Sequence, residues 1–174
     1  MFLGKLIKIN MELIKISKEQ IERAKKLYPF QELRGSITKG KGNLIGAVGE
    51  IIVFDLFTSK GYKVEFNSTY DYDLIIDELK VDVKSKGTNY KPVNSFNCSI
   101  PAAQKKQKCD YYFFTYITYD YKNCYLAGYK SKESFFKEAH FAKKGELDNN
   151  GSVVWTFKAD CYNLLIKELD IFKD

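Results

Sequence analysis

Asp73 and Asp82 are the residues of this sequence whose types and spacing could do chemistry. They flank two short β-prone runs, and the turn residues Asp77-Glu78 lie midway between them. If the chain reverses at that turn, the two carboxylates lie directly opposite each other, with Cβ atoms roughly 5 Å apart. Like charges at that separation destabilise a sheet, and a bound cation would remove the repulsion. Hard carboxylate oxygens suit Mg²⁺ or Mn²⁺.

Lys84 lies two residues beyond Asp82, so the alternation of side chains along a strand places both on one face. A lysine there could stabilise developing negative charge or help to activate a water molecule. The alternative is an ordinary solvated face with a cross-strand ion pair between Asp71 and Lys84. The other face of this predicted hairpin is apolar and collects Leu74, Ile76, Leu79, Val81 and Val83.

A helix is predicted directly upstream, from the apolar run at residues 44–57 to a stop near Gly61. Glu50 lies in this run among small and apolar neighbours, so its carboxylate is either partly buried with a partner or placed at a cleft. Gly46 and Gly49 each cost the helix roughly 1 kcal/mol relative to Ala. Their presence indicates the close approach of another backbone or of a ligand.

These features together resemble the PD-(D/E)XK nuclease superfamily, over about residues 42–120. The resemblance rests on Glu50 in GAVGE, Asp73 in YDYDLII, and the D-x-K element formed by Asp82 and Lys84 in VDVKS. It implies a restriction-endonuclease-like core within a mixed α/β fold, with a central mixed β-sheet flanked by helices. The sequence lacks a Pro before Asp73, and Asp71 is a rival for the same role.

The resemblance implies a metal-dependent nuclease acting on DNA, with endonuclease action the expectation. Glu50, Asp73 and Asp82 would then hold Mg²⁺ (or Mn²⁺), together with the backbone carbonyl of Val83. Lys84 would orient the attacking water or stabilise the charge of the transition state. Nothing in the sequence separates DNA from RNA, or one substrate structure from another.

Basic and polar residues elsewhere are candidates for holding the nucleic acid. Lys39 and Lys41 lie in a Gly-rich loop before the acidic helix, where a flexible connector is the alternative. Lys86 and Lys105 are further cations that could hold a strand electrostatically. The family resemblance makes Gln104 an accessory polar contact, with a simple surface helix as the alternative.

Composition predicts one globular domain over residues 1–174, in which residues 1–16 form an N-terminal extension or strand, and the resemblance implies that this domain is nuclease-like. The formal net charge of +6 and the pI near 8.9 are compatible with nucleic acid and do not establish it. The four cysteines lack C-x-x-C spacing, which argues against zinc. With no transmembrane stretch and no signal-peptide pattern, a cytoplasmic protein without membrane association is expected, and a homodimer stays open.

Two other classes of function remain as alternatives. One is a non-catalytic nucleic-acid-binding module that retains the nuclease fold, and the other is a protein-interaction domain that uses its aromatic surface.

The rest of the chain is expected to add a buried strand at residues 110–118 with a neighbour at 121–129. The pattern also predicts helices at 17–28, 100–108, 131–142 and 160–172, and a strand at 152–157.

Overall fold

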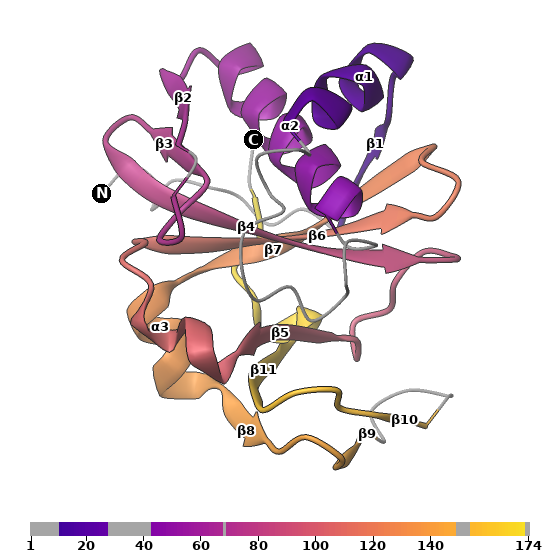
Figure 1. Ribbon diagram of the computed structural model, residues 1–174, viewed down its shortest axis with the longest axis vertical. Helices are drawn as coiled ribbons and strands as arrows, with labels where there is room; N and C mark the ends of the chain where they lie inside the picture. The colour runs from indigo at the N-terminus through magenta and orange to yellow at the C-terminus, as the bar shows by residue number, and fades with distance from the viewer. Residues whose placement is uncertain (1–10, 28–42, 68, 149–153, 173–174) are drawn as a thin grey trace.

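A curled six-stranded sheet with structure on both faces forms the centre of the molecule (Figure 1). The computed structural model describes residues 11–27, 43–67, 69–148 and 154–172. Two helices lie on one face of the sheet, and a three-stranded sheet with a third helix lies on the other. The expectation of a mixed α/β fold, with a central mixed sheet and flanking helices, is confirmed at this level.

The central sheet is mixed because one of its strand pairs is parallel. β4 runs parallel to β6, and every other neighbouring pair of this sheet is antiparallel. β6 is the near-continuous apolar strand that the sequence predicts, and it is buried along most of its length. The strand order is β1 (Glu12–Lys15), β7 (Asn123–Ser131), β6 (Tyr111–Thr118), β4 (Leu79–Thr88), β3 (Leu74–Ile76) and β2 (Val64–Phe66).

Helix α1 (Lys18–Leu27) begins at the predicted capping box. The Gln20 amide donates to Ser17 Oγ at 3.1 Å, and the Ser17 amide donates to Gln20 Oε1 at 3.0 Å. Helix α2 (Asn43–Ser59) follows, and the chain leaves it through Gly61, whose φ of +86° favours glycine. Both helix predictions are confirmed for the described residues.

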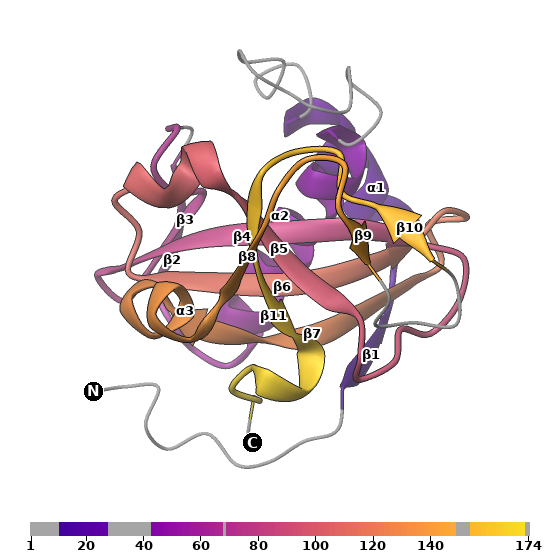
Figure 2. The same cartoon turned by 90° about the horizontal axis from the view of Figure 1, so that it is seen from below.

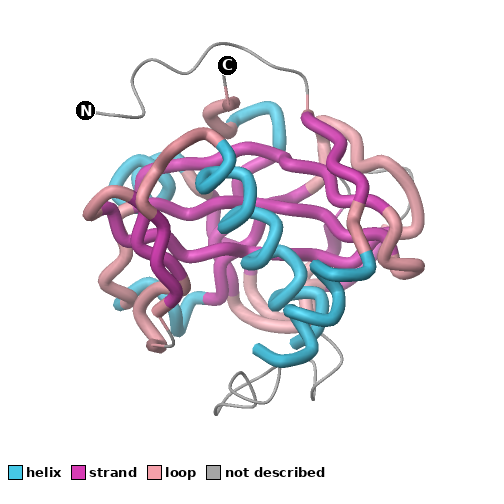
Figure 3. Tube along the Cα trace, turned by 90° about the horizontal axis from the view of Figure 1, so that it is seen from above, coloured by secondary structure: helices cyan, strands magenta, loops and turns pink. Residues whose placement is uncertain are grey.

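Helix α2 crosses the strands of the central sheet (Figure 3). It contributes seven of the eighteen buried residues of one hydrophobic core within the described part of the chain. Its buried residues pack against the apolar face of the β3–β4 hairpin and against β6. The helix therefore presses directly on the strand that carries Asp82 and Lys84. None of the described helices is long and apolar enough to cross a membrane.

The second layer is a three-stranded sheet in the order β5 (Asn97–Pro101), β11 (Cys161–Leu165) and β8 (His140–Ala142) (Figure 2). It packs with helix α3 (Lys132–Glu138) on the face of the central sheet opposite α2, around a second core. The short elements on this side are η3 (Ala102–Lys106), η4 (Ile166–Glu168), β9 (Leu147–Asp148) and β10 (Trp155–Thr156).

Three helix predictions in this layer are wrong in whole or in part. Residues 161–165 form a strand paired to β5 and β8, although the leucine spacing suits a helix. Ser131 caps α3 as expected, but the helix ends at Glu138 and His140 lies in β8. Residues 97–101 form a strand, and only the 3-10 helix η3 follows it. The predicted strand at 152–157 is described only at Trp155–Thr156.

Candidate active site

The β3–β4 hairpin has the predicted register. Leu74 pairs with Val81, Ile75 with Lys80 and Ile76 with Leu79, and the two-residue turn is Asp77-Glu78. Both turn residues have positive φ, at 44° and 74°, as the favoured two-residue hairpin turn requires. Continuation of the register sets Asp73 opposite Asp82.

Asp73 lies where β3 separates from β4. Its carboxylate accepts a backbone amide of β4 that no longer has a partner in β3. Its backbone amide donates to the carbonyl of Val81 at 2.9 Å. Its Oδ2 accepts the backbone amide of Val83 at 2.7 Å. The amide and carbonyl of one residue in an extended strand point to the same edge, so the Val83 carbonyl also lies on the Asp73 side of β4.

Asp82 is almost fully buried, with 3% of its surface exposed, and is held by two side chains. Its Oδ2 forms an ion pair with Lys84 Nζ. Its Oδ1 accepts a hydrogen bond of 3.1 Å from Gln107 Nε2. Lys84 Nζ also lies 5.8 Å from the centre of the Tyr112 ring. The D-x-K element is therefore a contact pair with fixed geometry.

The charges of three acids act on one another at this point. Burial raises the pKa of Asp73 well above its ordinary value, and the charges of Asp82 and Glu50 raise it further. Lys84 and the Val83 amide oppose this shift in pKa without cancelling it. The charge of Glu50, from helix α2, is thus one of those that raise the pKa of Asp73.

Lys84 stays positively charged in this environment. Burial lowers the pKa of Lys84, but the charges of Asp82 and Asp73 outweigh burial and leave the pKa above its ordinary value. A lysine that holds its proton is a poor general base and a good partner for negative charge. The arrangement favours charge stabilisation as its role.

Gly49 explains how closely helix α2 approaches the sheet. A Cβ on Gly49 would lie 1.9 Å from Ser85 Oγ and 2.9 Å from Thr115 Oγ1. The two hydroxyls, 2.7 Å apart, belong to β4 and β6. Helix α2 therefore touches β4 next to Lys84. The approach at Gly49 is close, as predicted, but it is to the side chains of Ser85 and Thr115 and not to a backbone or a ligand.

The hydrogen bonds of Asp71 and Asp73 distinguish the two candidates for the first acid of the site. Asp71 Oδ1 accepts the backbone amide of Lys108 at 3.1 Å. This bond ties the segment before β3 to the segment before β6. Asp73 is the carboxyl on which Asp82 and Glu50 act. The structure brings Asp73, and not Asp71, to the predicted site.

The lysines that the sequence offers as nucleic-acid contacts lie in different environments. Lys39 and Lys41 lie outside the described residues. Lys86 is turned inward, where its Nζ donates to Asn97 O at 2.7 Å and to Ser99 Oγ at 3.0 Å. Burial lowers the pKa of Lys86. This lysine is engaged within the fold, and a role for it as a surface phosphate contact is not supported.

The other two candidates lie on or beside η3. Lys105 is exposed, and its Nζ lies 4.8 Å from the centre of the Tyr162 ring. Gln104 has a buried Oε1 without a hydrogen-bond partner, and no hydrogen bond joins its side chain to the site acids within the described part of the chain. The residue that does reach Asp82 from this region is Gln107. No pattern in the sequence points to Gln107, because it lies in the irregular connection between η3 and β6.

The donor atoms are hard oxygens that suit Mg²⁺, but they do not form a closed cage. Within the ranges described, no group of three or more His, Cys, Asp or Glu side chains is arranged to hold a metal ion.

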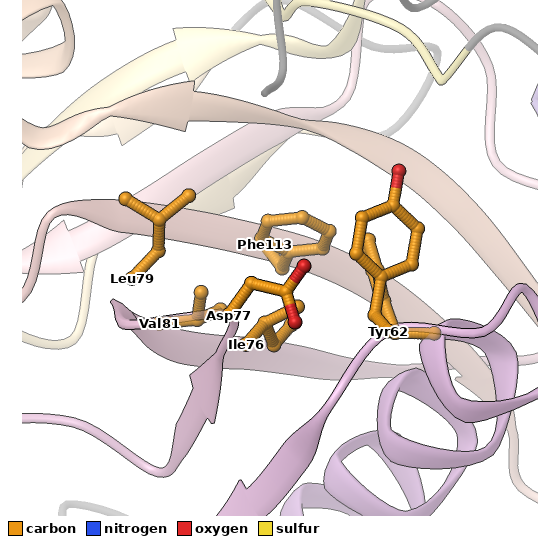
Figure 4. A pocket seen from close by; sticks show the side chains of 7 residues that line it. Tyr62, Ile76, Asp77, Leu79, Val81 and Phe113 are labelled. Carbon is orange, nitrogen blue, oxygen red and sulfur yellow. The ribbon is translucent and has the colours of Figure 1, made fainter. Parts of the chain in front are cut away.

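The nearby pocket in Figure 4 has a volume of about 20 Å³ and is apolar apart from Asp77. It lies beneath the other face of the hairpin, so it is not part of the site. Its lining residues are Phe57, Tyr62, Ile76, Asp77, Leu79, Val81 and Phe113.

Comparison with known proteins adds no assignment to this geometry. No protein-family model matches the chain, and a search of curated proteins finds no significant match.

Proposed function

We propose that this protein is a metal-dependent nuclease that hydrolyses phosphodiester bonds in DNA. The observation that carries the proposal is the placement of Asp73 against the Asp82–Lys84 ion pair at the seam between β3 and β4. Glu50 acts on the same site from helix α2. The proposal includes a restriction-endonuclease-like core, which the order of the acidic helix, the β3–β4 hairpin and β6 resembles.

The acids would hold Mg²⁺ (or Mn²⁺) in this proposal. Asp73 and Asp82 would supply carboxylate oxygens, the Val83 carbonyl would add a third ligand, and Glu50 would complete the set directly or through water. Lys84 alone offsets the negative charge that acts on Asp73, and repulsion between buried carboxylates favours an added cation. When bound, the ion would polarise the phosphate and make a water molecule acidic enough to attack phosphorus.

Lys84 would act on the phosphate. Its ammonium group is charged and is fixed beside Asp82 and over the Tyr112 ring. A cation held in advance stabilises the charge that develops on phosphoryl oxygens without reorganising during the reaction. Asp82 thus has two tasks, since it would bind the ion and orient Lys84.

DNA would be held mainly through its charge. Exposed lysines such as Lys105, and the net charge of +6, favour a polyanion. Lys39, Lys41 and Gln104 remain candidate contacts. Binding through lysines releases counterions, so affinity should fall steeply as salt rises.

A non-catalytic nucleic-acid-binding module is the second candidate, and one observation favours it. Asp82 has an ion pair with Lys84 and a hydrogen bond from Gln107, and Asp73 has a hydrogen bond from the Val83 amide. These contacts between groups of the chain itself are those expected of a module that needs no ion to fold. Such a protein would bind DNA and leave it intact.

The test is cleavage of plasmid, linear duplex and single-stranded DNA with Mg²⁺, Mn²⁺ or EDTA. Asp82→Asn and Lys84→Met should each lower the rate about 100-fold or more, because each removes charge from the site. Lys80→Met is the matched control. Its side chain is exposed two residues before Asp82, and cleavage should be unchanged.

Cleavage that persists in EDTA, or in both site variants, would contradict the proposal. DNA binding without cleavage under every metal condition would support the non-catalytic module instead.

A further inference from the structure

We propose that Gln107 is a positioning residue that holds the two aspartates of the site in their relative places. The inference rests on the proposed function, because it assigns a role to the supporting residues of that site. Gln107 lies between η3 and β6, is 2% exposed, and belongs to neither strand of the acidic hairpin.

A single nitrogen of Gln107 joins the two sides of the site. Its Nε2 donates to Asp82 Oδ1 at 3.1 Å and to the backbone carbonyl of Tyr70 at 2.8 Å. Tyr70 begins the short segment that delivers Asp73 to the seam. The amide group therefore holds the Asp82 carboxylate directly. It holds Asp73 indirectly, through the backbone of Tyr70.

Two further bonds tie the same segments together. The Tyr70 hydroxyl donates to Ala103 O at 3.0 Å, and the Lys108 amide donates to Asp71 Oδ1 at 3.1 Å. With the Gln107 bond, three hydrogen bonds join residues 70–71 to residues 103–108. Of these, only the Gln107 bond also reaches a site carboxylate.

Gln107 itself is anchored on its main chain. Its amide donates to Gln104 O at 3.0 Å, and its carbonyl accepts a hydrogen bond from Lys132 Nζ at the start of α3. The side chain thus projects from a backbone that is held on both sides. A group that sets the position of a carboxylate must itself be fixed, and this one is.

The cost of Gln107 also argues for a role beyond packing. Its Oε1 is buried and has no hydrogen-bond partner among the described residues. A buried, unsatisfied carbonyl oxygen is unfavourable, and an apolar side chain of similar size would avoid it. A glutamine differs from such an apolar side chain in the two hydrogen bonds that Nε2 donates to Tyr70 and Asp82.

The first test measures metal binding and does not need turnover. Mn²⁺ is titrated by calorimetry into the full-length wild type, Gln107→Leu and Gln107→Met. Removal of a residue that orients a metal ligand weakens the metal typically by 10–100-fold, so we expect the Mn²⁺ Kd of Gln107→Leu to rise at least about tenfold. Asn163→Leu is the matched control, because Asn163 is another buried side-chain amide, but it lies in β11 and donates to the carbonyl of Cys161, so its loss should leave the Kd unchanged.

The second test is independent of any metal. The Val83 amide donates to Asp73 Oδ2, so its hydrogen exchange reports whether Asp73 stays in place. In EDTA we expect the Val83 amide to exchange at least about tenfold faster in Gln107→Leu than in wild type, while the exchange of the β6 amides is unchanged. A general loss of stability would instead speed exchange across the whole sheet.

The outcomes separate the inference from the proposed function. If wild type does not bind Mn²⁺, the nuclease proposal fails, and the Val83 exchange still decides the role of Gln107. If wild type binds Mn²⁺ and Gln107→Leu binds it equally well, or if Val83 exchange is unchanged, the role of Gln107 is overturned. Should Gln107→Leu not fold, Gln107→Met serves the same measurements, because methionine has a similar volume and cannot donate a hydrogen bond to Asp82.

Discussion

The Val83 backbone amide donates a 2.7 Å hydrogen bond to Asp73 Oδ2, so the strand that carries the second acid of the site fixes the first. The bond forms where β3 has already left β4, at an amide that would otherwise lack a strand partner. It holds a carboxylate against Asp82 although the two repel each other. The local structure therefore maintains a charge arrangement that is unfavourable without a cation.

The first prediction follows from this repulsion. Asp73→Asn should raise the free energy of unfolding of the metal-free protein at pH 7, because the folded protein disfavours the ionised form of Asp73 and Asn carries no charge. The amide oxygen of Asn can still accept the Val83 bond, whereas the charge is lost. Denaturant unfolding in EDTA measures the difference.

The pH dependence of that difference has a definite sign. The pKa of Asp73 is higher in the folded than in the unfolded protein, so the unfolded state releases this proton first as pH rises. Wild type therefore loses stability relative to Asp73→Asn across the window from the ordinary pKa up to the raised one. At lower pH the two proteins should be equally stable. An Asp73→Asn protein that is less stable than wild type at pH 7 in EDTA would contradict the repulsion.

The second prediction concerns the turn that sets the register of the acids. Glu78 has a φ of 74°, a conformation that is unfavourable for residues with a Cβ. Glu78→Gly should raise the free energy of unfolding by about 1 kcal/mol, because glycine adopts this conformation without steric cost. Thermal or denaturant unfolding provides the measurement.

Asp77→Gly is the matched control for the turn. Asp77 also has a positive φ, of 44°, but its Oδ1 accepts the backbone amide of Lys63 at 2.9 Å. Aspartate tolerates this conformation better than glutamate, and the bond from Lys63, the residue before β2, would be lost. We expect no gain at this position, and an equal gain at both would show that the bond to Lys63 contributes nothing.

The hairpin and the acidic helix could be predicted from the sequence because their signals are local. The two β-prone runs and the turn between them fix which residue faces Asp82, and the register follows from counting. The apolar run around Glu50 is long enough that only a helix accommodates it. Glycine at position 49 indicated a close approach, which is a contact with Ser85 in β4.

The second layer could not be predicted in the same way, because distant segments define it. Leu164 and Leu165 lie in a strand whose two neighbours come from residues 97–101 and 140–142. Pairing on both edges satisfies the backbone of that segment and overrides its helix-compatible spacing. Gln107 was missed for the same reason, since its bond to Asp82 depends on how an irregular connection passes over β4.

The last prediction tests whether the contact between α2 and β4 positions Glu50. In an ordinary helix, Gly→Ala would stabilise by about 1 kcal/mol. At Gly49 the new methyl group would overlap Ser85 Oγ, so we expect Gly49→Ala to destabilise by about 1–3 kcal/mol and to weaken Mn²⁺ binding. The double variant Gly49→Ala/Ser85→Gly removes the overlapping hydroxyl, so it should recover part of the stability and the Mn²⁺ affinity relative to Gly49→Ala. Unfolding and calorimetry on the four proteins of this double-mutant cycle give the coupling energy between the two positions. A coupling near zero would show that α2 does not depend on this contact to bring Glu50 to the acids.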